Sequence, residues 1–195
     1  MSVTDQLTMP DCHAAWHCTP TGFALVSPLA ATRSVAAVGS VDMARAGRRI
    51  LDARSEIAEL LLDVALTEGH EAAALFDRAN DALRQAGLGR VDALALLSRA
   101  GDASTPTVSG VGSPLPLVVT KEHMSAPALT WVGLAPGWAV VLGSLDGMST
   151  PAADLLSPSD VRAALSLFDP SMLASSPRTL LAVVLDPIKG DPRPN

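Results

Sequence analysis

The apolar residues of this chain lie mostly in short runs that Gly or Pro interrupts, and this pattern constrains the fold more than any other feature. Runs of this length, bounded by turn residues, predict β-strands rather than long helices. Pro28 either weakens the prediction of the first strand or places that strand at a sheet edge, because proline cannot donate a ladder hydrogen bond. We expect strands at 22–29, 34–42, 90–100, 105–112, 114–121, 127–134, 137–145 and 178–186.

Three other stretches have helical spacing. From about residue 48 to Gly69, apolar side chains recur three or four residues apart with acidic residues between them. A second helix at 71–85 ends in "AGLG", which is typical of a glycine C-cap. A third, at 157–168, begins after Ser157 or Ser159 as its N-cap. Because strands and helices are clustered rather than alternating, the order favours mainly antiparallel sheets in a layered α/β (α+β) sandwich.

The composition supports one domain with a core of Ala, Val and Leu. Of the 195 residues, 48% are hydrophobic and only 3% aromatic, with no Tyr. The net charge of −6 without a basic stripe argues against nucleic acid or an anionic membrane as partner. No apolar run approaches the roughly 20 residues of a membrane span. Residues 1–20 lack the features of a signal peptide, which predicts a cytoplasmic protein with reduced cysteines.

The N-terminal stretch "CHAAWHC" offers four zinc-ligand side chains, Cys12, His13, His17 and Cys18. The two histidines are four residues apart and would share a helix face. Zinc sites of this kind draw a second pair of ligands from elsewhere, however, and the chain has no further Cys. We therefore favour an irregular N-terminal segment at 1–20 over a metal cluster, and a flexible tail at 188–195.

Carboxylates at strand ends are the remaining candidates for chemistry, since GxSxG, GxGxxG and GxxxxGK[ST] motifs are all missing from the sequence. Asp42, Asp146 and Asp186 each follow an apolar run. Taken singly, an Asp in this position usually starts a turn. If several of them converge, they form a site for Mg²⁺ or Mn²⁺, and two such ions can activate a water for phosphate ester hydrolysis.

The order of elements and the placing of these carboxylates resemble the PPM-type metal-dependent serine/threonine phosphatases, especially the compact SpoIIE-like and RsbX-like branch. The resemblance covers about residues 20–187. It rests on "GFALVSPLAATRSVAAVGSVDMARAG", "AALFDRANDALRQAGLGRVDALALLSRAG", "TVSGVGSPLPLVV", "GWAVVLGSLDGMS" and "SSPRTLLAVVL". It implies a phosphatase domain at 21–187 with a four-layer α-β-β-α sandwich. It also implies a cluster of Asp residues holding two Mn²⁺ or Mg²⁺ ions.

Two of the family's four metal positions keep their ligand. Asp42 matches the central Asp, although Met43 replaces the Gly that follows it. Asp146-Gly147 is intact, so Asp42, Asp146 and Gly147 are the implied metal residues.

The other two positions have lost their carboxylate. The family's Asp near Thr21-Gly22 is missing, and Pro177-Arg178 stands where the last Asp belongs. Arg178 would bring a positive charge into the site and could pair with Asp146 in place of a metal ion. The implied site is therefore degenerate.

Three functions follow as expectations. The first is a phosphatase-fold signalling protein that binds or acts on a phosphoserine or phosphothreonine regulator, of the anti-sigma antagonist type, with weakened or lost catalysis. This pseudophosphatase would work in a bacterial partner-switching or stress-response pathway. The second is an active Mn²⁺- or Mg²⁺-dependent phosphatase. The third is a non-enzymatic structural or oligomerisation domain.

Overall fold

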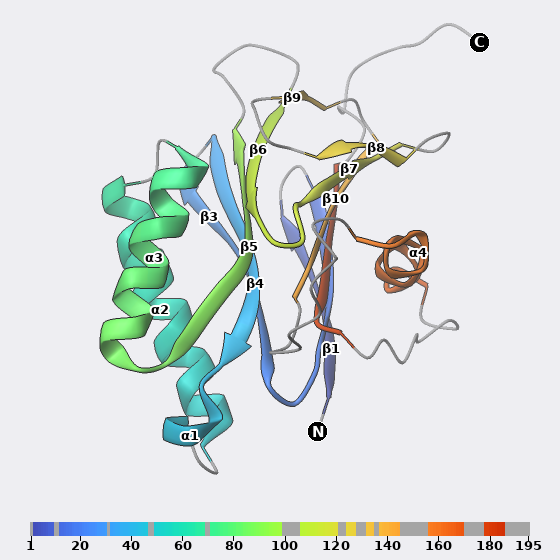
Figure 1. The fold of residues 1–195 in the computed structure, drawn as a ribbon. Helices are drawn as coiled ribbons and strands as arrows, with labels where there is room; N and C mark the ends of the chain where they lie inside the picture. Colours follow the sequence, from blue (N-terminus) through green and yellow to red (C-terminus); the bar gives the residue numbers. More distant parts are fainter. Residues whose placement is uncertain are drawn as a thin grey trace, which may run out of the picture.

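The computed structural model describes residues 2–9, 12–30, 32–46, 49–68, 71–98, 106–120, 124–127, 132–134, 137–144, 156–169 and 178–185. Two antiparallel sheets pack face to face, with helices on both outer faces (Figure 1). This is the predicted α+β sandwich in four layers.

The first sheet has the strand order β1-β2-β11-β10-β7-β8 and the second has the order β3-β4-β5-β6-β9, with antiparallel neighbours throughout. The strands of the first sheet are β1 (Val3–Met9), β2 (Cys12–Cys18), β7 (Leu117–Val119), β8 (Met124–Pro127), β10 (Ala139–Gly143) and β11 (Leu180–Leu185). Those of the second are β3 (Gly22–Ala30), β4 (Arg33–Val41), β5 (Gly89–Ser98), β6 (Thr107–Gly112) and β9 (Val132–Gly133). The helices are α1 (Met43–Ala46), α2 (Ile50–Glu68), α3 (Ala72–Ala86) and α4 (Pro158–Ser166).

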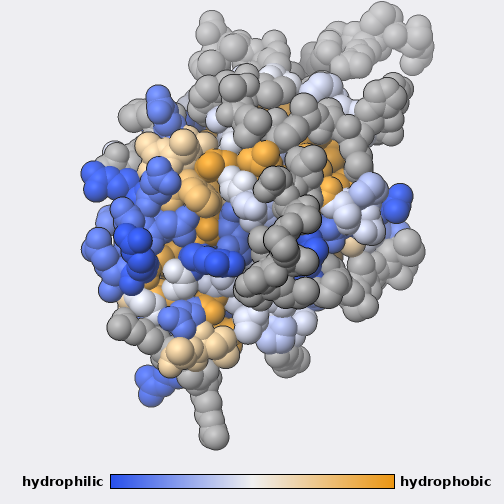
Figure 2. Space-filling view, viewed as in Figure 1, coloured by the Kyte–Doolittle hydropathy of each residue, from blue (hydrophilic) through white to orange (hydrophobic). Residues whose placement is uncertain are grey.

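Each interface between layers has its own apolar cluster. Ile57 of α2 and Leu83 of α3 pack against the outer face of the second sheet, where they form one cluster with Leu94 of β5. The polar faces of these two helices point to solvent and form the hydrophilic side on the left of Figure 2. Helix α4 covers the outer face of the first sheet through Val161 and Ala164. Small and branched side chains fill the space between the sheets, and Ala is frequent there because the chain has few aromatic residues. These side chains include Ala14, Ala36, Val38, Ala93, Ala95, Val140, Leu142, Leu181 and Val183.

The local signals at the helix ends are confirmed. Gly87 follows α3 in a left-handed conformation at φ 65°, which glycine adopts without a steric penalty. Ser157 caps α4 and forms a capping box with Asp160. None of the helices within the described ranges combines the length and apolar character that crossing a bilayer requires.

The prediction of an irregular segment at 1–20 is wrong. Residues 3–9 and 12–18 form a hairpin, and β2 also pairs with β11 inside the first sheet. Alternate side chains of β2 explain this: Cys12 and Ala14 enter the core between the sheets, while Ala15 packs on the α4 side. The single strand expected at 127–134 is instead divided between β8 and β9. The tail at 188–195 lies outside the described residues.

Candidate functional site

The turn before β3 and Asp42, two of the positions matched to metal ligands, meet at one end of the sandwich. This end carries α1 and lies at the bottom of Figure 1. The Val41 N–H donates to the Thr21 carbonyl at 2.8 Å, which places the end of β4 beside the turn before β3. The Asp42 N–H donates to the Leu88 carbonyl at 2.8 Å, so the turn after α3 lies against the same point. Thr21 and Asp42 are therefore neighbours, as the matched metal positions require.

Asp42 is exposed at this end and begins α1. Its Oδ1 accepts the Ala44 N–H at 2.9 Å, so the carboxylate caps the short helix. Met43, in the position of the family's Gly, is the first residue of α1 and is 41% exposed. A helical conformation is open to any residue, so methionine fits this position without backbone strain. Asp42 lines a cavity of about 330 Å³ with Asn80, Asp81, Arg84, Gly87, Gly89 and Arg90.

The turn at 19–22, where the matched Asp is missing, is held by an arginine. Arg54 of α2 donates from Nε to the Gly22 carbonyl at 2.9 Å and from Nη2 to the Thr19 carbonyl at 2.7 Å. Thr179, just before β11, accepts the Thr19 N–H on Oγ1 at 3.1 Å. A Cβ on Gly22 would lie 1.7 Å from that Oγ1, so only glycine allows this approach. The chain's own side chains therefore fill this part of the site.

A buried carboxylate that the sequence analysis did not identify lies close by. The register of β4 and β5 shifts between Val38, opposite Ala93, and Gly39, opposite Val91. Asp92 is thus the extra residue of a β-bulge, and a bulge re-aims its side chain. Only 6% of Asp92 is exposed. The signal in the sequence was an acidic residue inside the otherwise apolar run "RVDALALL".

Asp92 links the two sheets. Its Oδ2 accepts the hydroxyl of Ser144 at 2.5 Å, and its Oδ1 accepts Nε of Arg90 at 2.8 Å. Ser144 directly follows β10 and is fully buried, and its N–H donates to the Thr179 carbonyl at 2.9 Å. The end of β10 and the start of β11 are thereby joined to the bulge in β5. Asp146 and Gly147, two and three residues beyond Ser144, lie outside the described residues, as does Asp186.

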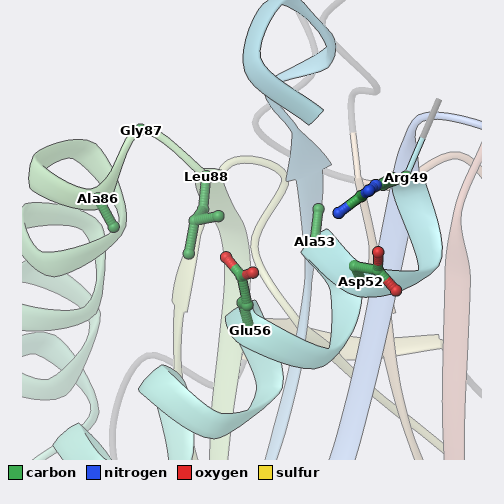
Figure 3. Close-up of a pocket in the computed structure, with 7 residues that line it drawn as sticks. All are labelled: Arg49, Asp52, Ala53, Glu56, Ala86, Gly87 and Leu88. Atoms are coloured by element: carbon green, nitrogen blue, oxygen red, sulfur yellow. The ribbon is translucent and has the colours of Figure 1, made fainter. Parts of the chain in front are cut away.

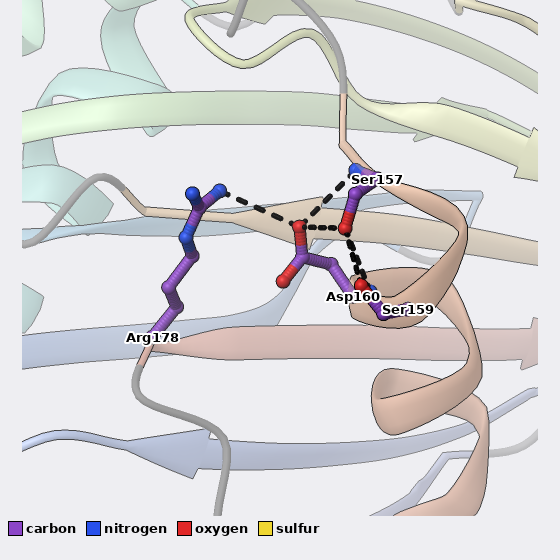
Figure 4. Close-up of polar contacts among 4 residues, drawn as sticks. All are labelled: Ser157, Ser159, Asp160 and Arg178. Atoms are coloured by element: carbon purple, nitrogen blue, oxygen red, sulfur yellow. Dashed lines mark hydrogen bonds and ion pairs between the residues drawn. The ribbon is translucent and has the colours of Figure 1, made fainter. Parts of the chain in front are cut away.

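Arg178 contacts helix α4. Its Nη1 lies 3.4 Å from Oδ2 of Asp160 (Figure 4). The same Oδ2 accepts the Ser157 hydroxyl at 2.6 Å and the Ser157 N–H at 3.1 Å. Arg178 therefore stabilises the start of α4 through the capping carboxylate. The pairing of Arg178 with Asp146 stays a prediction.

The residues of "CHAAWHC" do not form a metal cluster. In a strand, Cys12 and Cys18 face one side and His13 and His17 the other. The histidines contact the neighbouring strand, with His17 Nδ1 3.0 Å from Thr4 Oγ1 and His13 Nδ1 3.2 Å from Thr8 Oγ1. Within the part of the chain that the structure describes, no group of three or more His, Cys, Asp or Glu side chains could hold a metal ion.

A second hollow of about 190 Å³ lies between the start of α2 and the end of α3 (Figure 3). Charged side chains of both signs come from α2 and the residue before it, and backbone from the end of α3. The lining residues are Arg49, Asp52, Ala53, Glu56, Ala86, Gly87 and Leu88. Gly87 lines both hollows, which therefore adjoin and form a mixed-charge surface that includes Asp42.

The described side chains at this end do not fit a pair of hard divalent ions. Such ions need several carboxylate oxygens and water. Near the matched positions, Asp42 caps α1 and the buried Asp92 is held by Ser144 and Arg90. The Thr19 and Gly22 carbonyls accept hydrogen bonds from the Arg54 guanidinium, which is itself a cation.

Two facing antiparallel sheets between helical layers, with the polar cluster at one end, define the class: the chain has the PPM-type phosphatase fold of SpoIIE-like and RsbX-like domains. The crystal structure of RsbX in complex with magnesium superposes with a TM-score of 0.53 at 11% identity, over 94% of this chain and 100% of that one. The RsbU and RsbW domains of a Mycobacterium tuberculosis protein give 0.52 at 17% identity, over 91% of this chain and 60% of that one. The SpoIIE phosphatase domain of Bacillus subtilis gives 0.50 at 13%, over 100% and 97%. No family model and no curated protein matches the sequence.

Proposed function

We propose that this chain is a cytoplasmic bacterial signalling protein with the SpoIIE/RsbX-like phosphatase fold and with weakened or lost catalysis. It binds a phosphoserine- or phosphothreonine-bearing protein regulator, of the anti-sigma antagonist type, in a partner-switching or stress-response pathway. The observation that carries this proposal is the Arg54 guanidinium on the Gly22 and Thr19 carbonyls, at the turn where the resemblance places a metal-binding Asp.

Three features support a loss of metal binding. Thr179 packs against Gly22 so closely that no side chain fits on that residue. Asp42 and the buried Asp92 already accept hydrogen bonds from the chain itself. Arg178 occupies the last matched position and lies beside Asp160. Positive side chains thus stand at two of the four positions or next to them, and they repel divalent cations.

The surface around Asp42 supports binding of a protein partner. Its two hollows hold Arg49, Arg84 and Arg90 beside acidic side chains. Arginine binds phosphate in a bidentate geometry. We expect a phosphoserine peptide of the regulator to bind more tightly than the same peptide with serine, as measured by fluorescence anisotropy.

Calorimetric titration with Mn²⁺ tests the loss of the metal site. We expect no binding of two ions at micromolar affinity, because two ligand positions are gone. Asp146→Asn should then leave the titration unchanged. Micromolar affinity for two ions, lost in Asp146→Asn but kept in Asp63→Asn on the exposed face of α2, would contradict the proposal.

An active Mn²⁺- or Mg²⁺-dependent phosphatase is the second candidate, favoured by the exposed Asp42 that lines a cavity. It predicts hydrolysis of p-nitrophenyl phosphate in the presence of Mn²⁺, with Asp42 and Asp146 as metal ligands. The rate should then fall at least about a hundredfold in Asp146→Asn and stay unchanged in Asp63→Asn. A rate indistinguishable from that of buffer with Mn²⁺ rules out this candidate.

A further inference from the structure

Strand β1 forms one edge of the six-stranded sheet. It pairs with β2 over all of its residues, from Val3 opposite Cys18 to Met9 opposite Cys12. Among the described residues, no strand pairs with its other side. Half of the backbone N–H and C=O groups of an edge strand point away from the sheet, and they can pair with another extended chain.

The other three edge strands have features that block such pairing. Strand β3 contains Pro28 and a register shift beside it. Strand β8 ends at Pro127 and pairs irregularly with β7. Strand β9 has only two residues. Prolines, bulges and short length are the usual protections of sheet edges.

Strand β1 has none of these features. It is seven residues long, its register with β2 is unbroken, and Asp5 is its one charged residue. Val3 and Leu7 are 40% and 38% exposed, and with Asp5 they lie on one face of the strand. The opposite face is anchored: Thr4 and Thr8 contact the histidines of β2, and Gln6 Nε2 donates to the Leu167 carbonyl at 2.8 Å. The result is a regular, accessible edge.

We propose that a second copy of this chain pairs with this edge, β1 against β1 in antiparallel orientation, so that the two six-stranded sheets become continuous. A two-fold axis perpendicular to the sheet keeps odd residues opposite odd residues. A register centred on Asp5 would place two carboxylates face to face, which is unfavourable. A register centred on Gln6 pairs all seven residues. It places Asp5 opposite the partner's Leu7 and Val3 opposite the partner's Met9.

This register gives a charge test with a matched pair of variants. Leu7→Glu places a carboxylate opposite the partner's Asp5 twice in each dimer, which should weaken dimerisation by about tenfold or more. Leu7→Lys places an ammonium there instead and should keep or strengthen the dimer. Leu66→Glu, on the exposed face of α2 at 67% exposure, makes the same charge change away from the edge and should have no effect.

Light scattering coupled to size exclusion measures the mass of each protein over a dilution series. We expect wild type and Leu7→Lys at twice the chain mass of 20.1 kDa, with Leu7→Glu shifted toward the single-chain mass. A wild-type monomer at every loading concentration would overturn the proposal. So would a dimer that Leu7→Glu and Leu7→Lys affect equally.

A cross-link tests the same contact without a charge change. Residues opposite each other in antiparallel strands have Cα atoms about 4.5–5.5 Å apart, which is within disulfide range. Gln6→Cys should therefore give a disulfide-linked dimer under mild oxidation, and Leu66→Cys should not. The native Cys12 and Cys18 are buried and do not interfere. A wild-type dimer without this cross-link would place the interface on another face.

Discussion

The buried hydrogen bond between Ser144 and Asp92 gives the sharpest test of how the two sheets are joined. Ser144→Ala removes the hydroxyl that donates to Oδ2 of Asp92 at 2.5 Å and adds no bulk. Ser144 is fully buried and Asp92 is 6% exposed, so water cannot easily replace the lost donor. Arg90 still donates to the other carboxylate oxygen, so the charge keeps one partner.

Hydrogen bonds to charged groups contribute about 1.5–3 kcal/mol, and we expect Ser144→Ala to lower the free energy of unfolding by about 2 kcal/mol. For a domain of this size that corresponds to a fall in Tm of about 4–8 °C. Asp92→Asn should cost a similar amount. Because the two side chains share one contact, the double variant should cost less than the sum of the single variants by about 1 kcal/mol or more.

Urea denaturation followed by circular dichroism measures these differences. Ser55→Ala is the matched control, since Ser55 is exposed on α2 and its hydroxyl bonds only within the helix, to the Leu51 carbonyl at 3.2 Å. The control should change the free energy of unfolding by less than about 0.5 kcal/mol. If Ser144→Ala changes it no more than Ser55→Ala does, the link between the sheets does not contribute as argued.

Two further substitutions probe the same end of the molecule. Gly22→Ala forces a methyl group against Thr179 and should lower the free energy of unfolding by about 1–3 kcal/mol in urea titrations. Gly143→Ala meets mainly the side-chain end of Leu156 and should cost less, so an equal or larger loss there would refute the packing argument. Ser157→Ala removes the N-cap of α4 and should lower Tm through a loss of about 0.5–2 kcal/mol. Ser159→Ala removes only a hydroxyl 2.8 Å from that of Ser157, leaves the capping bond to Asp160 in place and should cost less. Equal melting curves for the two serine variants would contradict the capping role.

The helices and most strands could be predicted because their signals are local. Apolar residues at helical spacing define the buried faces of α2 and α3, and Leu83 is fully buried as that spacing requires. Gly87 and Ser157 end and begin helices through contacts within a few residues. The short apolar runs correspond to β4, β5 and β10, which are buried on both faces between the layers.

The N-terminal hairpin could not be predicted because its stability is not local. Strand β1 reads "VTDQLTM" and is exposed over most of its length, so it has no buried face to mark it. Strand β2 becomes a strand by pairing with β11, whose residues lie more than 160 positions away in the chain. Its Cys and His residues suggest metal ligands by their types alone, but the alternation of a strand places the cysteines and the histidines on opposite faces.

The site likewise combines features that could be predicted with features that depend on contacts between distant parts of the chain. The turn before β3 and the end of β4, which the resemblance matched to two of the metal positions, are neighbours in the structure, where the Val41 N–H donates to the Thr21 carbonyl. Asp92 was missed because its direction depends on a bulge, and a bulge follows from the register of two strands rather than from one. Arg54 was missed because in the sequence it is one polar residue on a helix. Its role depends on the contact with the turn at 19–22, which forms only in the folded chain.

These missed residues have a common physical role. Arg54, Thr179 and Asp92 join four segments in the described part of the site. These segments are the turn at 19–22, the end of β10, the start of β11 and the bulge in β5. Two of these ties use a charged group, the Arg54 guanidinium on carbonyl oxygens and the Asp92 carboxylate on a hydroxyl, and such hydrogen bonds are the stronger kind. Protein groups therefore hold these described segments together. The loss of a carboxylate near Gly22 is compatible with a stable fold because Arg54 satisfies the carbonyls of that turn.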